Sequence, residues 1–295
     1  MDNFTLALNY NTVFVALGKA DSYALSVFDR CPQDYDEKTY AELCSVSPAE
    51  MSEARDTACR AFEALPRDVR IMSPADYTWP VGVKDVPFLY MRGDTGLLTK
   101  PGVSIVGTRH PSDRGVRLAR EAATVVGNYG YNIVSGLASG IDGVAHIQAL
   151  ADEKPTVAVI GTPIDVCYPP EHEKLQNMIA DLGLVVSRFS PCVKTQKYYF
   201  MVRNLLMSQL SVASIVVEST DGGGGVRQAQ YCEKQDKKVI IFREVFEDRS
   251  RMWPRSFRDP AVVSKADDIP KVLRGSSTRT AKAVQEDLQP GLFDF

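Results

Sequence analysis

The chain has no apolar run long enough to cross a membrane. None of its apolar stretches approaches the ~20 residues that a membrane-spanning helix requires. Residues 1–4 also place no basic flank before an apolar run, as a secretory signal would. These two absences predict a cytoplasmic protein with no membrane partner.

The six cysteines lack the spacing of a metal site. The sequence has no Cys-x-x-Cys pair and no group of cysteine and histidine with zinc-ligand spacing. Reduced structural thiols are therefore expected, and the sequence predicts neither a metal nor a cofactor.

A large charge of one sign is also missing, because the 295 residues carry a net charge of only −3. The protein as a whole therefore does not attract a polyanion. The distribution is uneven: residues 100–242 hold 15 basic and 13 acidic side chains, and residues 243–282 hold 10 and 6. A site for a polyanion must be a local basic patch in one of these two regions.

The composition is that of a globular protein with a core. Hydrophobic residues make up 44% and charged residues 24%, which is far from the disordered class. The length exceeds that of one minimal domain, so we expect a main domain with appended pieces. The predicted pieces are a small helical domain in residues 1–70, the main domain in residues 71–245, an extension packing on the core in residues 246–275, and a flexible tail in residues 276–295.

The central region alternates between short apolar runs and helical patterns. Six runs have the length and composition of buried parallel strands, at residues 103–106, 132–134, 156–160, 184–186, 214–217 and 239–242. Four segments between them have helical periodicity, at residues 113–128, 141–151, 171–182 and 226–235. Repeated alternation of strand and helix predicts an α/β fold with a doubly wound parallel sheet.

The loops after the predicted strands are rich in glycine and hydroxyl residues. Ligands of a doubly wound sheet bind at the carboxyl ends of its strands. After the first central strand, Ser112 can cap a helix whose N-terminus attracts a phosphate. Gly107, Thr108 and Arg109 precede it, and Arg109 adds a cationic group. The alternative is a capping turn with a surface arginine.

A second loop repeats this arrangement after the next predicted strand. Gly136 and Gly140 allow the backbone to approach a ligand closely, and Ser135 and Ser139 offer hydroxyl groups. A second phosphate site is therefore plausible. Asp142, at the start of the next helix, is expected to have a structural role.

A run of four glycines precedes the last predicted helix of the sheet. Gly222, Gly223 and Gly224 belong to it and would allow close backbone approach to an anion or a sugar, although a flexible turn is the alternative. Three such loops on one edge of the sheet favour a shared site for a nucleotide or a nucleic acid.

Residues 194–204 interleave cations with aromatic side chains. The cations can meet phosphates, while Tyr198, Tyr199 or Phe200 stacks on a base, a contact worth ~1–3 kcal/mol. For Phe200 the alternative is packing under the following helix.

Taken together, these motifs resemble the DprA/Smf family of DNA-processing proteins. The similarity covers about residues 73–242, and its most specific part is Ser-Gly-Leu-Ala-Ser-Gly-Ile-Asp at residues 135–142, followed by Ala145-His146. Other motifs follow in the family's order, at residues 77–80, 87–93, 103–112, 165–169, 200–204 and 216–218.

The resemblance implies an extended Rossmann-like fold that binds single-stranded DNA in a basic pocket and has no catalytic residue. It also implies a homodimer that passes the strand to a RecA-type recombinase in natural transformation or recombination. By motif, Gly107, Arg109 and Ser112 would hold phosphate, and Ser135 and Gly136 would line the pocket.

The same resemblance assigns the cation-rich segment to the grip on the strand. Lys197, Phe200, Arg203 and Asn204 match the family's positions, and Lys194 is an alternative to Lys197.

The sequence departs from the family pattern in two places, after the fifth apolar run and after the sixth. Residues 220–225 read Thr-Asp-Gly-Gly-Gly-Gly in place of a Ser-Gly-Ser/Thr turn, which puts the acid Asp221 near the pocket. After Phe242 the family's proline-glycine turn is replaced by a stretch that is basic over residues 249–258. The sequence also shows no C-terminal winged helix.

The last seven residues, 289–295, resemble the Gln-x-x-Leu-Phe peptide with which bacterial proteins dock on the replication sliding clamp. Gln289, Leu292 and Phe293 would be its anchors. The alternative is an amphipathic tail that folds back on its own domain.

Two other functions would use the same pocket. One is a sensor that binds a small nucleotide, and the other is a LOG-type nucleotide phosphoribohydrolase. In the enzyme, Glu218 or Asp221 would act on the glycosidic bond. The LOG-type Pro-Gly-Gly-x-Gly-Thr pattern is absent, and Gln228 and Gln230 stand where its acid would be sought. We therefore favour a binder of single-stranded DNA.

Overall fold

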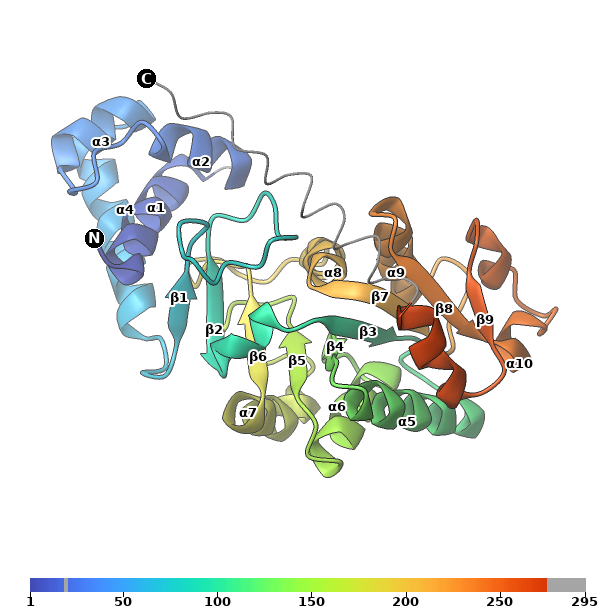
Figure 1. The fold of residues 1–295 in the computed structure, drawn as a ribbon. Helices are drawn as coiled ribbons and strands as arrows, with labels where there is room; N and C mark the ends of the chain where they lie inside the picture. The colour runs from blue at the N-terminus through green and yellow to red at the C-terminus, as the bar shows by residue number, and fades with distance from the viewer. Residues whose placement is uncertain (19–20, 275–295) are drawn as a thin grey trace, which may run out of the picture. The chain divides into compact units, whose positions relative to one another are not determined.

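The computed structural model describes residues 1–18 and 21–274 (Figure 1). They form two compact units, each made of two segments of the chain. The first unit comprises Met1–Thr99 and Ala158–Leu206, and the second comprises Lys100–Val157 and Met207–Phe295, described up to residue 274. The expected boundaries at residues 70 and 245 follow sequence order, whereas each unit combines segments that lie far apart in the sequence. The expected tail, with Gln289, Leu292 and Phe293, lies outside the described residues.

The first unit begins with four helices, as expected for a small helical domain. They are α1 (Asn3–Leu17), α2 (Asp21–Phe28), α3 (Glu37–Cys44) and α4 (Pro48–Glu63). Asp2 caps α1 by accepting a hydrogen bond from the Thr5 N–H, and Ser47 and Glu50 form a capping box at the start of α4. Their apolar faces enclose a core that includes Val13, Val27, Tyr40 and Met51.

The first unit also holds an antiparallel set of strands. β1 (Arg70–Met72) pairs with β2 (Leu89–Gly93), and β2 pairs with β6 (Leu184–Ser187), both antiparallel. These antiparallel pairs add to the parallel sheet that the sequence predicts, so the sheet is mixed. The reason is local: residues 73–88 join β1 to β2 without a helix, and only parallel neighbours require a crossover helix. β5 (Thr156–Val159) begins in the second unit and ends in the first. The first unit also contains α7 (Glu173–Leu182) and most of α8 (Tyr199–Gln209).

The second unit confirms the doubly wound parallel sheet. Its strands are β3 (Gly102–Val106), β4 (Asn132–Ser135), β7 (Ser211–Val216), β8 (Lys238–Phe242) and β9 (Ala261–Val263). They lie in the order β4-β3-β7-β8-β9 and pair in parallel. Nearly every position of β3, β4, β7 and β8 is buried, as in strands covered on both faces.

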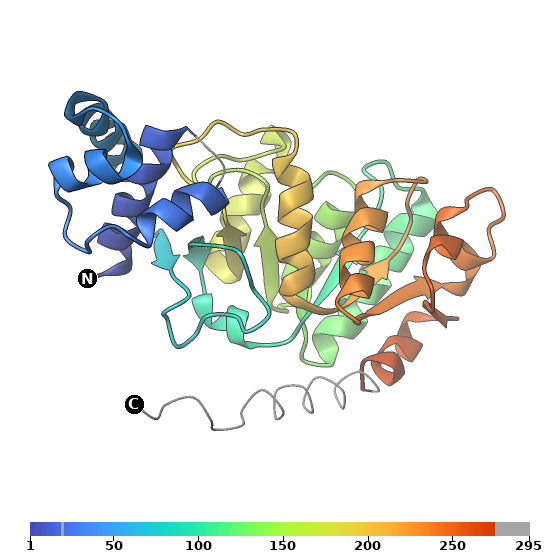
Figure 2. The ribbon, with the colours of Figure 1, turned by 90° about the horizontal axis from the view of Figure 1, so that it is seen from above.

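Helices cover both faces of this parallel sheet (Figure 1, Figure 2). α5 (Asp113–Asn128) and α6 (Ile141–Ala151) pack together on one face, and α9 (Gly224–Lys234) lies on the other. The C-terminal part adds α10 (Arg243–Phe246) and a short 3₁₀ turn, Trp253–Ser256, in which Trp253 is buried. Within residues 1–18 and 21–274, no helix has the length and apolar character to span a membrane.

The strand order creates a switch point between β3 and β7. From β3 the chain continues to β4 on one side, and from β7 it continues to β8 on the other. The loops that leave β3 and β7 therefore diverge at the carboxyl ends of two neighbouring parallel strands. This is the place where doubly wound sheets bind their ligands.

All six cysteines are free. Burial raises the pKa of the Cys31, Cys192 and Cys232 thiols to about 11, so these thiols stay protonated near neutral pH. They are packed side chains rather than reactive groups.

Candidate functional site

Three loops of the second unit meet at the switch point, and we call them the switch-point loops: residues 107–112, 135–142 and 218–225. The first and third are in backbone contact. A Cβ atom on Gly107 would lie 2.5 Å from the Glu218 carbonyl oxygen, and one on Gly225 would lie 3.1 Å from the Gly107 nitrogen. The Thr108 N–H donates to the Glu218 carbonyl at 2.6 Å. Glycine is therefore required at both positions for the loops to come together.

The N-terminus of α5 is occupied by a carboxylate of the protein itself. Ser112 caps the helix by accepting from the Gly115 N–H at 3.2 Å. The Glu218 Oε2 atom accepts hydrogen bonds from the Ser112 N–H and from its hydroxyl, each at 3.0 Å. A Cβ atom on Gly115 would lie 2.2 Å from the same oxygen, so this glycine leaves the room that the carboxylate fills. The expected phosphate position near Ser112 thus already holds a negative group.

Arg251 balances the charge of Glu218. Its guanidinium lies 3.5 Å from Glu218 Oε1 and also donates to the Ser219 carbonyl. The Glu218 side chain is only 6% exposed, and a buried carboxylate needs such a partner. The basic stretch after residue 242 therefore supplies a structural cation to the third switch-point loop.

Asp221, the acid in the glycine loop, caps the same C-terminal segment. Its Oδ1 atom accepts from the Met252 N–H at 3.0 Å and from the Trp253 N–H at 2.6 Å. The two segments that depart from the family pattern are therefore bonded to each other. Asp221 and Arg251 connect the glycine loop to the segment that replaces the family's usual continuation.

The N-terminus of α9 differs from that of α5. Gly223 is its N-cap and makes no side-chain capping bond, and Gly222 has a φ of +71°, which favours glycine. A Cβ atom on Gly222 or on Gly224 would meet no atom within 4 Å. The surface beside Gly222 and Gly224 therefore has space for another atom, whereas the Gly223 N–H already donates to the Thr220 carbonyl at 3.0 Å.

The second switch-point loop supports the first. Gly140 has a φ of +79°, and a Cβ atom there would lie 2.4 Å from the Thr108 carbonyl, which accepts from the Ile141 N–H at 3.1 Å. Ser135 is fully buried and donates to the Ile105 carbonyl at 2.6 Å. This contact is structural, because the hydroxyl has no access to solvent.

Other members of this loop divide between structure and surface. The Gly136 N–H donates to Asp142 Oδ2 at 3.1 Å, which gives Asp142 the structural role expected from the sequence. Ser139 is half-buried, and Arg109, across from Gly140, is exposed. Arg109 is thus the cation of the switch-point loops that faces solvent at the predicted phosphate site.

The remaining predicted residues belong to the first unit. Lys194 and Lys197 are exposed on the loop before α8. Phe200 is half-buried, and its ring lies against Gly161, where a Cβ atom would come within 2.6 Å. Tyr168, which sequence reasoning did not select as a site residue, is 46% exposed, and its ring centroid lies 5.1 Å from that of Phe200.

Arg203 and Asn204 are buried in the first unit. The Arg203 guanidinium donates to the Val159 carbonyl at 2.7 Å and to Asn204 Oδ1 at 3.1 Å. Arg203 therefore binds the carboxyl end of β5, and its grip on a DNA strand stays a prediction. The sequence indicated a cation at this position, but nothing in it indicated that Arg203 is buried.

No group of three or more His, Cys, Asp or Glu side chains in residues 1–18 and 21–274 is arranged to hold a metal ion. The switch-point loops carry the exposed cation Arg109, and the first unit separately carries Lys194, Lys197 and the paired rings of Tyr168 and Phe200.

The sequence matches the DNA recombination-mediator protein A family over residues 70–273, and the chain belongs to that family. It is similar to the DNA processing protein DprA of Bacillus subtilis (33% identical over 175 residues, 55% of this chain and 59% of the relative). It is also similar to DprA of Streptococcus pneumoniae (34% over 166 residues, 56% and 58%) and to protein Smf of Synechocystis (39% over 140 residues, 48% and 35%). The matches span between about a third and three fifths of these relatives.

Two solved structures have a similar fold. The X-ray structure of DprA from Streptococcus pneumoniae superposes with a TM-score of 0.70 at 25% identity, covering 92% of this chain and 98% of the other. DprA from Helicobacter pylori, whose structure is described in terms of a single-stranded DNA binding mode, gives 0.53 at 24% identity, covering 75% and 97%. The second likeness shows the fold alone.

Proposed function

We propose that this protein binds single-stranded DNA and takes part in DNA processing without catalysing a covalent reaction. Its family and the names of its relatives support this function. The observation that carries the proposal is at the switch point. There the exposed Arg109 offers a cation to a phosphate, and the space beside Gly222 and Gly224 lets a strand approach the backbone at the start of α9.

The first unit separately carries groups that suit a single strand. Phe200 and Tyr168 form an aromatic pair with Tyr168 exposed, and Lys194 and Lys197 lie close by in sequence to meet phosphates. Stacking on aromatic rings together with cationic contacts is the usual chemistry of single-strand binding without a sequence code.

The environments of the two carboxylates support a binder over a nucleotide hydrolase. A catalytic carboxylate has to reach the glycosidic bond. Glu218 is buried and bonded to Ser112 and Arg251, and Asp221 is bonded to the backbone of Met252 and Trp253. Both are engaged in holding the loop.

The partners we propose follow from family resemblance. They are a second copy of the chain in a homodimer, a RecA-type recombinase that receives the strand in natural transformation, and the replication sliding clamp. Cytoplasmic location follows from the same proposal, because recombination of incoming DNA takes place there. Deleting residues 289–295 should abolish clamp binding while leaving DNA binding unchanged, and unchanged clamp binding would rule out the peptide.

Fluorescence anisotropy with labelled oligo-dT and with a duplex of equal length, each at two salt concentrations, tests the function. We expect tight, salt-sensitive binding of the single strand and weak binding of the duplex. Absence of binding to both would overturn the proposal and favour a mononucleotide ligand.

Replacing Arg109 locates the phosphate site. Arg109→Ala should weaken binding of oligo-dT and reduce the slope of log affinity against log salt by about 0.7, the value for one phosphate contact on a single strand. Arg120→Ala is the matched control, because it removes another exposed arginine, from the body of α5. Equal salt slopes in the two variants would place the phosphate contact elsewhere.

A further inference from the structure

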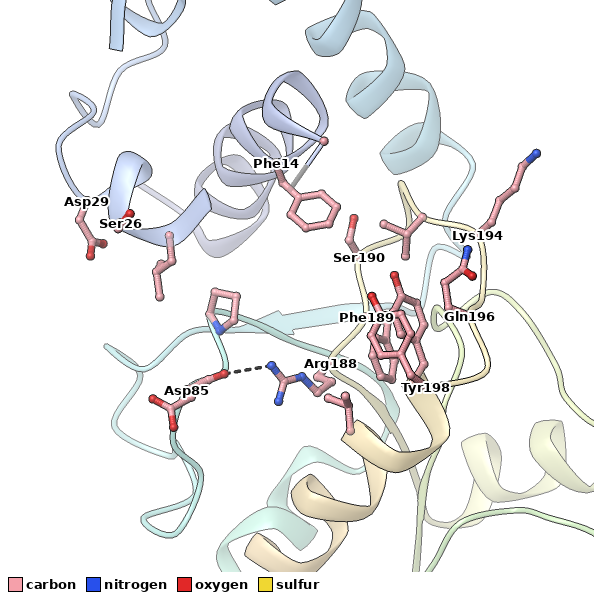
Figure 3. A pocket seen from close by; sticks show the side chains of 16 residues that line it. Phe14, Ser26, Asp29, Asp85, Arg188, Phe189, Ser190, Lys194, Gln196 and Tyr198 are labelled. Atoms are coloured by element: carbon pink, nitrogen blue, oxygen red, sulfur yellow. Dashed lines mark hydrogen bonds between the residues drawn. The ribbon is translucent and has the colours of Figure 1, made fainter. Parts of the chain in front are cut away.

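A pocket of about 940 Å³ in the first unit carries no net charge. Asp29 and Asp85 lie at one end of it and Lys194 at the other (Figure 3). Arg188, between them, donates to the Asp85 carbonyl at 3.0 Å (Figure 3). Two acids and two bases line this pocket, so its charge does not attract a polyanion. An excess of cations lies instead in the C-terminal part of the second unit.

Residues 243–258, which we call the arginine segment, contain five arginines and three acids. The segment begins with α10, directly after β8 (Figure 1). β7 and β8 pair in parallel, so their carboxyl ends lie at the same edge of the sheet. The third switch-point loop leaves β7 at this edge, and the arginine segment leaves β8 there. The two are therefore neighbours at the edge where doubly wound sheets bind ligands.

Hydrogen bonds fix the distance between the arginine segment and the glycine loop. The Arg255 guanidinium donates to the Arg251 carbonyl at 3.5 Å. That carbonyl belongs to the same peptide as the Met252 N–H, which donates to Asp221 Oδ1 at 3.0 Å. The Arg255 guanidinium therefore lies within about 9 Å of this atom of the glycine loop. Glu218 connects the segment to the first switch-point loop as well, because its carboxylate pairs with Arg251 and its carbonyl accepts from the Thr108 N–H.

Apolar side chains anchor the arginine segment on the core. Trp253 and Phe257 are 2% and 6% exposed, and their rings lie edge to face with centroids 6.4 Å apart. Pro254 is buried beside Trp253. Arg255, in the same 3₁₀ turn, is exposed. Because its backbone is already ordered, this cation loses less conformational entropy on binding than one on a mobile loop would.

The acids of the arginine segment are paired, whereas two of its cations are available. Each acid lies within 4 Å of an arginine, in the pairs Glu244–Arg117, Glu247–Arg243 and Asp248–Arg114. Arg249 and Arg255 are exposed and form no ion pair with any residue that the structure describes. Arg258 is also exposed, but its N–H donates to Glu233 Oε1 at 2.7 Å and it precedes Asp259, so it lies among acids. The net positive charge of the segment therefore resides at Arg249 and Arg255.

We propose that Arg249 and Arg255 extend the phosphate site of the switch-point loops along this edge of the sheet. A single strand held at Arg109 then places two further phosphates on the arginine segment. The ligand is the sugar-phosphate backbone, so these contacts add affinity without a base preference. This inference rests on the proposed function. Exposed arginines also suit an acidic protein, but the bonds of Glu218 and Asp221 to the segment put these cations beside the loops proposed to bind DNA, which favours the strand.

The salt dependence of oligo-dT binding, measured by anisotropy, tests the extension. Arg249→Ala/Arg255→Ala should reduce the slope of log affinity against log salt by about 1.4, twice the value for one phosphate contact on a single strand. The control Arg120→Ala/Arg258→Ala removes two exposed arginines as well, so it has the same net charge, and it should keep the wild-type slope. Equal slopes in the two double variants would overturn the extension and leave the arginine segment to another partner.

A conservative variant separates charge from shape. Arg249→Lys/Arg255→Lys keeps both charges but not the planar guanidinium groups, so it should retain most of the wild-type slope, which depends on the number of phosphates neutralised. A slope as low as that of the alanine variant would overturn phosphate contact through charge at these positions. Failure of the wild-type protein to bind oligo-dT would instead overturn the proposed function.

Discussion

The N-termini of α5 and α9 have equivalent positions in the fold but different surroundings. Each follows a parallel strand at the switch point, and each lies in a loop rich in glycine and hydroxyl residues. At α5 the side chains of Ser112 and Glu218 fill the end of the helix. At α9 the N-cap Gly223 makes no side-chain bond and the surface around Gly224 is open. One helix end is thus filled by side chains of the protein, and the other has space beside Gly222 and Gly224.

The difference arises from partners that are distant in sequence. Glu218 lies 106 residues after Ser112, and Arg251 comes from the C-terminal segment beyond the sheet. A helix N-terminus attracts any nearby negative group, and at α5 the Glu218 carboxylate already occupies this position. A glycine-rich loop after a strand therefore identifies a place where an anion can bind. It does not show whether a carboxylate of the protein already occupies that place.

The largest effect is expected from removing the carboxylate at α5. Glu218→Ala leaves Arg251 and the Ser112 N–H without their partner, so it should lower the free energy of unfolding by about 3 kcal/mol in urea denaturation. Glu121→Ala, which removes an exposed carboxylate from the same helix, is the control and should change it by less than about 1 kcal/mol. A loss at Glu218 no larger than that of the control would show that the carboxylate does not stabilise this helix end.

A smaller effect is expected at the connection between the glycine loop and the C-terminal segment. Asp221→Ala removes the acceptor for the Met252 and Trp253 N–H groups and should cost about 1 kcal/mol, as loss of a helix cap does. In a Trp79→Phe background the fluorescence of Trp253 reports the change, since its burial should decrease. Asp221→Ala should shift the Trp253 emission to longer wavelength. Asp221→Asn keeps an acceptor oxygen, so its emission should stay close to that of the parent protein. An equal shift in both variants would contradict a capping role.

The smallest effect on stability and a clear effect on binding are expected at α9. Gly224→Ala adds a methyl group where no atom lies within 4 Å, so the free energy of unfolding should change by less than about 1 kcal/mol. If phosphates approach this backbone closely, affinity for oligo-dT should fall several-fold. Anisotropy and thermal unfolding of the same sample separate the two quantities. Unchanged affinity with unchanged stability would show that the strand does not contact this end of α9.

Much of the fold follows from local patterns. All six apolar runs are strands in the structure, and the helical periodicity of residues 113–128 and 141–151 coincides with α5 and α6. The antiparallel strands β1 and β2 were harder to anticipate, because prolines obscure the pattern in the sequence before them and strand direction depends on pairing.

The candidate site was found by its loops, but the roles of individual residues were only partly predictable. Arg109 and the glycines near α9 are exposed, as a binding role needs, whereas Ser135 and Arg203 are buried and bonded to main-chain carbonyls. Residue type shows that a side chain can bind phosphate. Burial decides whether it is free to do so, and burial depends on the packing of the whole unit.

The sequence by itself determined the parallel sheet, its family and the edge at which a ligand is expected, because these follow from hydrophobic periodicity and from ordered motifs. Tertiary structure alone decided which helix end is filled and what the acid of the glycine loop does. Each of these depends on contacts between residues far apart in the chain, such as Ser112 with Glu218 and Asp221 with Trp253. Electrostatic and hydrogen-bonding partners are chosen by distance in space, which local sequence patterns do not specify.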